Sequence, residues 1–443
     1  MIETIKEHEV KRMTRIQAQI EQARAGALDQ AILHLYRADY LETQRSRCIH
    51  VMDGFASHFE DSELLLFSAP GRTEIGGNHT DHQHGCVLAA GIDRDTLAAV
   101  SPVSEAVITL ISEGYAPMEV SLDTLSPVPS EVGTSVALIR GVAAGFLKRG
   151  YRIGGFKAYV QSEVPSGAGL SSSAAFETLI GTIFSFLYND GVVPPKQIAI
   201  IGQEAENVFF GKPCGLMDQM ACSLGSLVAI DFADPTAPKE TAIPFDFSEC
   251  GFNLCISNCG GSHADLTDDY ASIPVEMKLV ASEFGEEVLR RILPEQLLNA
   301  LPSLYKKVPD RAILRSIHFV QENQRAQDEA AALLRGDLTA FLNLVQASGN
   351  SSFQFLQNVY APKRPEDQSL AVALAATQLF LNGQGAYRVH GGGFAGTIQA
   401  FVPMERTESY QMLMNGIFGE GACHILSIRP VGGVKLEFGG DQK

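Results

Sequence analysis

A glycine- and serine-rich stretch at residues 164–175, VPSGAGLSSSAA, constrains the fold of this chain more than any other segment. The alternating segment 156–160 before it predicts a strand, and the run 174–180 after it predicts a helix. The first N–H groups of a helix have no internal partner, and the helix dipole favours negative charge at that end. Since glycines also let the backbone approach a phosphate closely, the stretch predicts an anion-binding loop.

For a lone Gly-x-Gly, an ordinary serine-capped helix would be the better interpretation, but this stretch is longer and more restrictive. It is not the Walker pattern, because no Gly-Lys-Ser/Thr follows. The stretch resembles the ATP-phosphate loop of the GHMP kinases, the family of galactokinase, homoserine kinase and mevalonate kinase. That resemblance implies phosphate contacts from the following residues: Ser166, Gly167, Ala168, Gly169, Leu170, Ser171, Ser172 and Ser173.

A second motif, GRTEIGGNHTDHQHG at residues 71–85, follows the apolar segment 64–70. Polar groups crowded after an apolar strand indicate a polar-ligand site, and the histidines leave a zinc site as an alternative. The motif closely resembles the galactokinase signature Gly-Arg-Val-Asn-Leu-Ile-Gly-Glu-His-Thr-Asp-Tyr-Asn-Gly-Gly. The resemblance implies that Arg72 is catalytic and that Asn78, His79 and Asp81 contact a sugar.

A third segment, residues 203–219, resembles the galactokinase run Ala-Glu-x-x-Phe-x-Gly-x-Pro-Cys-Gly-Ile-Met-Asp-Gln. The resemblance implies that Asp218 is the catalytic base for the anomeric hydroxyl, that Gly215 lines the sugar site, and that Ser173 and Glu206 bind Mg²⁺. We expect Arg72 to pair with Asp218 and to lower its pKa. In an alternative mechanism, Arg72 and Asp218 act by electrostatics and positioning, and the anomeric hydroxyl loses its proton late.

Two later segments complete the resemblance. Residues 263–270 have the His-to-Tyr spacing of a galactokinase segment, which implies that Tyr270 lines the sugar pocket. Residues 387–398 resemble the motif Arg-x-Thr-Gly-Gly-Gly-Phe-Gly-Gly, which implies that Gly392 and Gly393 approach the phosphates. Taken alone, three glycines would indicate only a bulge between strands.

The composition limits the compartment and the partners. A net charge of −17 argues against a nucleic-acid partner and against an anionic membrane surface. The eight cysteines show no Cys-x-x-Cys pair, and the N-terminus is polar rather than a signal peptide. No apolar run is long enough for a membrane span. We therefore expect a cytoplasmic protein, a monomer or weak homo-oligomer, whose partners are ATP, Mg²⁺ and a hexose.

The resemblance implies a two-domain α+β fold with the active site in the cleft between the domains. The chain is long enough for this arrangement. We expect a helical extension over residues 1–60, an N-terminal domain over 61–235 that holds the sugar signature, the phosphate loop and Asp218, and a C-terminal domain over 236–443. The implied activity is transfer of the γ-phosphate of ATP to the C1 hydroxyl of galactose.

The match to the galactokinases is incomplete at the sugar. Asn78 stands where the signature has Glu, which in the family reaches the C6 hydroxyl, and His82 replaces a Tyr. Because Asn lacks a negative charge that would repel a C6 carboxylate, galacturonate or another C6- or C2-modified hexose is an alternative substrate. On this basis Asn78→Glu should tighten galactose binding. A non-catalytic sensor of sugar and ATP is a further alternative, which the intact Arg72, Glu206 and Asp218 disfavour.

Overall fold

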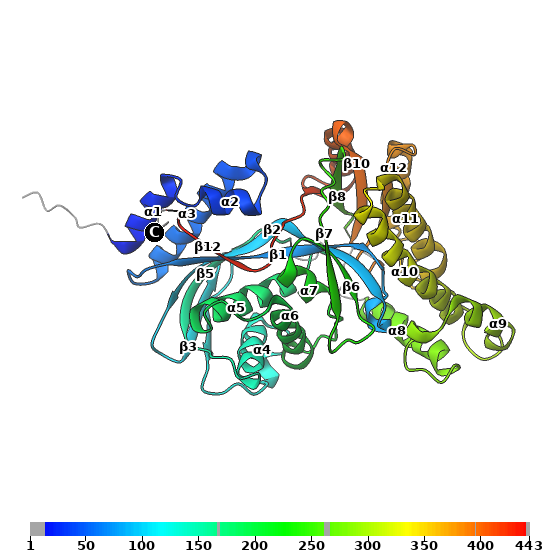
Figure 1. Ribbon diagram of the computed structural model, residues 1–443, viewed down its shortest axis with the longest axis horizontal. Helices are drawn as coiled ribbons and strands as arrows, with labels where there is room; N and C mark the ends of the chain where they lie inside the picture. Colours follow the sequence, from blue (N-terminus) through cyan, green and yellow to red (C-terminus); the bar gives the residue numbers. More distant parts are fainter. Residues whose placement is uncertain (1–13, 166–168, 261–265, 395, 440–443) are drawn as a thin grey trace, which may run out of the picture.

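The computed structural model describes residues 14–165, 169–260, 266–394 and 396–439. Figure 1 shows a mixed α/β arrangement in which two sheets are surrounded by helices, with the C-terminal sheet beside one end of the N-terminal sheet. The α+β class predicted from the sequence is therefore the fold that forms.

The first sheet has eight strands in the order β12-β1-β2-β5-β3-β4, and β6 pairs with β2 and with β7. All of its pairings are antiparallel except that between β3 and β5. Its strands are β1 (Leu65–Gly76), β2 (Cys86–Pro102), β3 (Val107–Ser112), β4 (Met118–Ser121), β5 (Phe156–Ser162), β6 (Leu227–Asp231), β7 (Lys239–Ile243) and β12 (Val434–Leu436). Because β7 and β12 join this sheet, it extends past residue 235, the boundary expected from the sequence.

Helices cover both faces of this sheet (Figure 1). On one face lie α1 (Arg15–Arg24), α2 (Asp29–Leu35) and α3 (Leu41–His58). On the other lie α4 (Ser135–Lys148), α5 (Ser172–Tyr188), α6 (Pro195–Glu204) and α7 (Met217–Leu224). Helix α5 is apolar on nearly every side, which is typical of a buried helix, and it packs against β1, α4, α6 and α7.

A buried carboxylate joins helix α3 to the sheet. Asp95 on β2 accepts hydrogen bonds from Arg47 of α3 at 2.5 Å and from Arg429 at 2.9 Å. Burial alone would raise the pKa of Asp95, but the charges of Arg47 and Arg429 outweigh that effect and lower it to about 2. Helix α3 is therefore held to the sheet by an ion pair, and all three helices are held by apolar contacts.

The second sheet is antiparallel and has the order β11-β8-β10-β9. Its strands are β8 (Phe252–Asn258), β9 (Ala386–His390), β10 (Thr397–Pro403) and β11 (Cys423–Leu426). One face packs on α12 (Ser369–Leu381) and α13 (Thr407–Phe418), and the other on α10 (Asp310–Leu334) and α11 (Leu338–Ser351). Helices α8 (Thr267–Ser282) and α9 (Pro294–Leu304) pack on the first half of α10.

The turn of the β1–β2 hairpin, residues 77–85, joins the two halves of the molecule. Glu322 of α10 accepts hydrogen bonds from the backbone N–H groups of Gly77 and Asn78, both at 3.3 Å. The carbonyl oxygen of Asn78 lies 2.9 Å from Nε2 of His318, also on α10. Since this turn carries Asn78, His79 and Asp81, its bonds to α10 help to position three of the predicted sugar residues.

Candidate active site

Asp218 is the second residue of α7, and both of its carboxylate oxygens have a partner. Arg72 Nε donates to Oδ1 at 2.7 Å, and Ser171 Oγ donates to Oδ2 at 2.5 Å. Burial raises the pKa of Asp218, but the charge and hydrogen bond of Arg72 and the bond from Ser171 outweigh it and hold the pKa below its ordinary value. Asp218 is therefore ionised at neutral pH. Its side chain is 34% exposed, so the carboxylate remains accessible.

Arg72 also holds the predicted phosphate loop against strand β1. Its guanidinium donates to the carbonyl oxygen of Gly169, and its backbone N–H donates to that of Leu170 at 3.1 Å. A Cβ at Gly71 would lie 2.7 Å from the Leu170 oxygen, so this close approach requires glycine. The predicted catalytic arginine and the predicted phosphate loop are thus in direct contact.

The described part of the predicted loop is Gly169 to Ser173, and Ser166, Gly167 and Ala168 lie outside the described residues. Ser171 precedes α5 with φ of 59°, in the left-handed region that non-glycine residues seldom adopt. Its hydroxyl bonds to Asp218 and makes no capping bond to the helix. The first N–H groups of α5 therefore have no cap from Ser171, as an anion site requires.

Glu206 lies in a π-helix, η4 (Ala205–Phe210), which continues α6 and is a feature frequently found at functional sites. Its Oε1 accepts hydrogen bonds from Ser173 at 3.2 Å and Lys212 at 3.1 Å, and its Oε2 accepts one from Gln219 at 2.8 Å. The oxygens of Glu206 and Ser173 suit Mg²⁺. No three His, Cys, Asp or Glu side chains of the described residues converge as a metal site, so other ligands would come from phosphate and water.

Asp81 and Gly215 lie against each other, although they come from distant segments. A Cβ at Gly215 would lie 1.8 Å from Asp81 Oδ2, so a larger residue there would displace the Asp81 carboxylate. Burial, and after it the negative charge of Asp218, raises the pKa of Asp81 to about 6. The predicted sugar residues Asp81, Gly215 and Asp218 therefore gather at one place in the folded chain.

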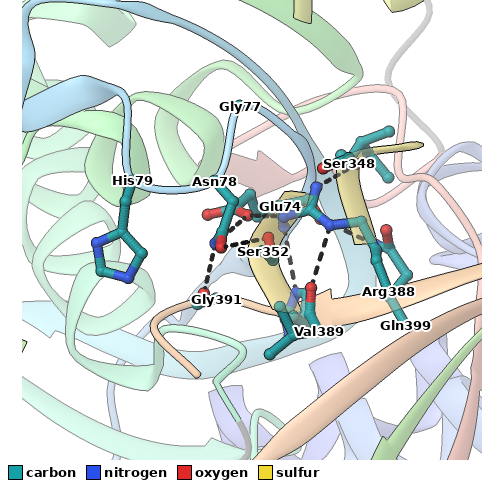
Figure 2. Close-up of polar contacts among 12 residues, drawn as sticks. Glu74, Gly77, Asn78, His79, Ser348, Ser352, Arg388, Val389, Gly391 and Gln399 are labelled. Carbon is teal, nitrogen blue, oxygen red and sulfur yellow. Dashed lines mark hydrogen bonds and ion pairs between the residues drawn. The ribbon is translucent and has the colours of Figure 1, made fainter. Parts of the chain in front are cut away.

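The three other predicted sugar residues each donate to the glycine turn between β9 and β10. Asn78 Nδ2 donates to the carbonyl oxygen of Gly391 at 2.7 Å, as Figure 2 shows. His79 Nε2 lies 3.0 Å from the Gly392 oxygen, and the Tyr270 hydroxyl donates to the Gly393 oxygen at 2.7 Å. The first motif, Tyr270 and the glycine motif thus form one hydrogen-bonded unit.

Gly392 and Gly393 pack closely against Tyr270 and Asn358. A Cβ at Gly392 would lie 2.3 Å from a ring carbon of Tyr270, and one at Gly393 would lie 2.1 Å from the Asn358 carbonyl oxygen. A Cβ at Gly169 would lie 3.0 Å from Thr397 Oγ1, so the start of β10 is near the phosphate loop. The phosphate role of the two glycines stays a prediction.

Sequence reasoning missed several partners that hold these groups. Ser171 was expected to bind phosphate, and its bond to Asp218 was not foreseen. Glu74 on β1 and Arg388 on β9 form an ion pair at 2.5 Å beside Asn78. Glu74 precedes Asn78 by four residues in the same motif, and a charged residue inside an apolar strand was the signal that could have identified it.

Two family models match the chain. The GHMP kinase N-terminal domain matches residues 137–226, and the galactokinase galactose-binding signature matches residues 53–102. These matches cover the phosphate loop, Glu206 and Asp218 in the first case and the sugar motif in the second. No helix in the described ranges has the length and apolar character needed to cross a membrane.

Solved structures share the fold. Lactococcus lactis galactokinase complexed with galactose is 24% identical over 87% of this chain and 98% of its own, with a TM-score of 0.74. Methanococcus jannaschii mevalonate kinase is 15% identical over 82% of this chain and 98% of its own, with a TM-score of 0.56. Streptococcus pneumoniae phosphomevalonate kinase is 12% identical over 83% of this chain and 99% of its own, with a TM-score of 0.56. The chain thus carries segments that match the GHMP kinase N-terminal domain and the galactokinase galactose-binding signature, on a fold that it shares with solved kinases of these names.

Proposed function

We propose that this protein transfers the γ-phosphoryl group of ATP to the C1 hydroxyl of galactose, giving galactose 1-phosphate and ADP. The observation that carries the proposal is the set of contacts at Asp218. This carboxylate bonds to Ser171 of the phosphate loop and to Arg72 of the sugar motif, and its charge acts on Asp81. An acceptor hydroxyl beside Asp218 would then face the phosphates at the start of α5.

In this proposal Asp218 accepts the proton of the anomeric hydroxyl, and Arg72 stabilises negative charge on the transferred group. The low pKa of Asp218 makes it a weak base, which favours proton loss late in the transfer. The 2.7 Å bond from Arg72 also positions the carboxylate, so the same pair accounts for the electrostatic alternative.

Ser173 and Glu206 would hold Mg²⁺, and their 3.2 Å separation and oxygen atoms fit that cation. A cation held there would supply positive charge to neutralise the phosphates of ATP. Gln219 holds Glu206 in place by donating to its Oε2, and Lys212 balances the charge of Oε1. These two residues position the carboxylate before the nucleotide arrives.

The experiment is ADP release from Mg·ATP with galactose, galacturonate, N-acetylgalactosamine, glucose and no sugar. We expect ADP release with galactose well above the sugar-free rate, with one galactose 1-phosphate formed for each ADP released. Release with another hexose alone would keep the kinase class and reject galactose. Binding of both ligands without turnover would favour the non-catalytic sensor.

A further inference from the structure

We propose that Glu74 and Asn78 are an exchanged carboxylate–amide pair, which holds the glycine turn and makes the sugar site select a hexose with an uncharged C6. The inference rests on the proposed function, because it names the substrate class of the same site. It reverses the expectation from sequence that the loss of a carboxylate at position 78 opens the site to a uronic acid.

The exchange is visible in the motif itself. The galactokinase signature has Asn at its fourth position and Glu at its eighth, whereas this chain has Glu74 at the fourth and Asn78 at the eighth. The two positions together keep one carboxylate and one amide. The negative charge has therefore moved four residues along the chain and has not been removed.

The side chain of Asn78 has no hydrogen-bonding capacity left for a sugar. Its Nδ2 donates to Glu74 Oε1 at 3.0 Å and to the Gly391 oxygen at 2.7 Å. Its Oδ1 accepts from Ser352 at 3.2 Å and from Asn358 at 3.0 Å. These bonds use both N–H donors and two acceptor positions, and the residue is fully buried. Figure 2 shows Asn78 among Glu74, Gly391 and Ser352.

The orientation of this amide follows from its neighbours. The Glu74 carboxylate and the Gly391 carbonyl only accept hydrogen bonds, so the NH₂ group of Asn78 must face them. A carboxylate at position 78 would instead meet these two acceptors with no proton between them. Asn78 is thus a positioning residue for the glycine turn.

The carboxylate of Glu74 is committed to Arg388. The Arg388 guanidinium donates to Glu74 Oε1 at 2.5 Å (Figure 2). It also donates to the backbone oxygen of Ile75 at 2.8 Å. The side chain of Arg388 is fully buried and that of Glu74 nearly so. Because each charge neutralises the other, the guanidinium is not available to a substrate carboxylate.

The charged side chains around the sugar motif are largely engaged with one another. Arg72 is paired with Asp218 at 2.7 Å. Arg315 shares Glu276 with Arg311, at 2.9 Å and 2.5 Å, and its Nη2 has no hydrogen-bond partner among the residues that the structure describes. Burial lowers the pKa of His79 to about 4, and burial followed by the charge of His79 lowers that of His82, so both rings are neutral at pH 7. Lys278 lies on the exposed surface of α8, where water screens its charge.

Two carboxylates therefore face the site, and the guanidinium groups of Arg72 and Arg388 are each paired with a carboxylate. Asp81 and Asp218 both lie at the sugar position, and each would repel a carboxylate at C6. Burying an anion with no cationic partner is strongly unfavourable. A neutral hydroxymethyl group at C6 meets no such penalty.

The first test is the sugar selectivity of the unmodified enzyme. We expect kcat/KM for galacturonate to be lower than that for galactose by about 100-fold or more, the scale of an unpaired buried charge. Equal or better turnover of galacturonate would overturn the inference while leaving the kinase function intact. Absence of turnover with every hexose would instead reject the proposed function, and the inference with it.

The second test separates the pair from its surroundings by exchanging the two residues. Asn78→Glu and Glu74→Asn should each lower kcat/KM for galactose by about tenfold or more, and the double exchange should recover much of that loss, since contacting residues couple. Glu74→Asn should also shift the galacturonate-to-galactose ratio toward galacturonate, because Arg388 loses its counter-charge. A merely structural role would leave that ratio unchanged.

Asn343→Glu is the matched control. Asn343 is exposed on α11, so this substitution makes the same chemical change at the surface. It should leave kcat/KM and the melting temperature unchanged. A folded Asn78→Glu variant with higher kcat/KM for galactose would show that position 78 reads the sugar and would overturn the inference. The inference would also be overturned if the loss of kcat/KM in the double variant equalled the product of the losses in the two single variants.

Discussion

Acid should weaken galactose binding through Asp81, and the structure sets the pH at which this happens. The proposed function requires the ionised form, because a carboxylate accepts hydrogen bonds from two sugar hydroxyls. Burial and the charge of Asp218 raise the pKa of Asp81 to about 6. The ionised fraction therefore falls about tenfold between pH 7 and pH 5, and the dissociation constant for galactose should rise by about the same factor.

The assay is calorimetric titration of galactose into the enzyme between pH 5 and pH 8, without nucleotide. Leaving ATP out removes the titration of its phosphates from the profile. Asp81→Asn should bind galactose weakly and with little pH dependence. A wild-type dissociation constant that stays flat down to pH 5 would refute the assignment of Asp81.

A second variant tests the cause of the shift. Asp218→Asn removes the negative charge that raises the pKa of Asp81, so the pH at which binding weakens should move down. It should stay above the ordinary range of an aspartate, because burial, the larger cause, is unchanged. Movement to higher pH would show that the two carboxylates do not interact as the structure places them.

Three further predictions follow from the same contacts. Asp218→Asn should lower kcat by about 100-fold or more while galactose and ATP still bind, which rapid-quench turnover and calorimetry would measure together. Glu206→Gln should raise the Mg²⁺ concentration needed for half-maximal rate by about tenfold or more, and an unchanged Mg²⁺ dependence would reject the site. Arg388→Met leaves Glu74 buried without its partner and should cost about 3–5 kcal/mol of stability in urea unfolding. The exposed Arg335→Met is its control and should cost almost nothing.

The chemistry of the site could be predicted from the sequence because each motif is local. The stretch 164–175 places small residues and a helix start together, and these alone indicate an anion site. The motif at residues 71–85 and the run that ends at Asp218 likewise state which side chains are present and at what spacing. Their resemblance to one family then predicted the fold, and with it the contact between Arg72 and Asp218.

Which partner each polar group takes was decided by the tertiary structure. Glu74 and Arg388 are 314 positions apart, and only the packing of the two sheets brings them within 2.5 Å. Asn78 was predicted to face a sugar, yet the glycine turn, Ser352 and Asn358 surround its amide. A buried polar atom bonds to whatever the fold places beside it, because water is excluded there and an unmet bond is costly. The sequence therefore determined the kind of chemistry, and the packing of distant segments determined which side chains remain available to perform it.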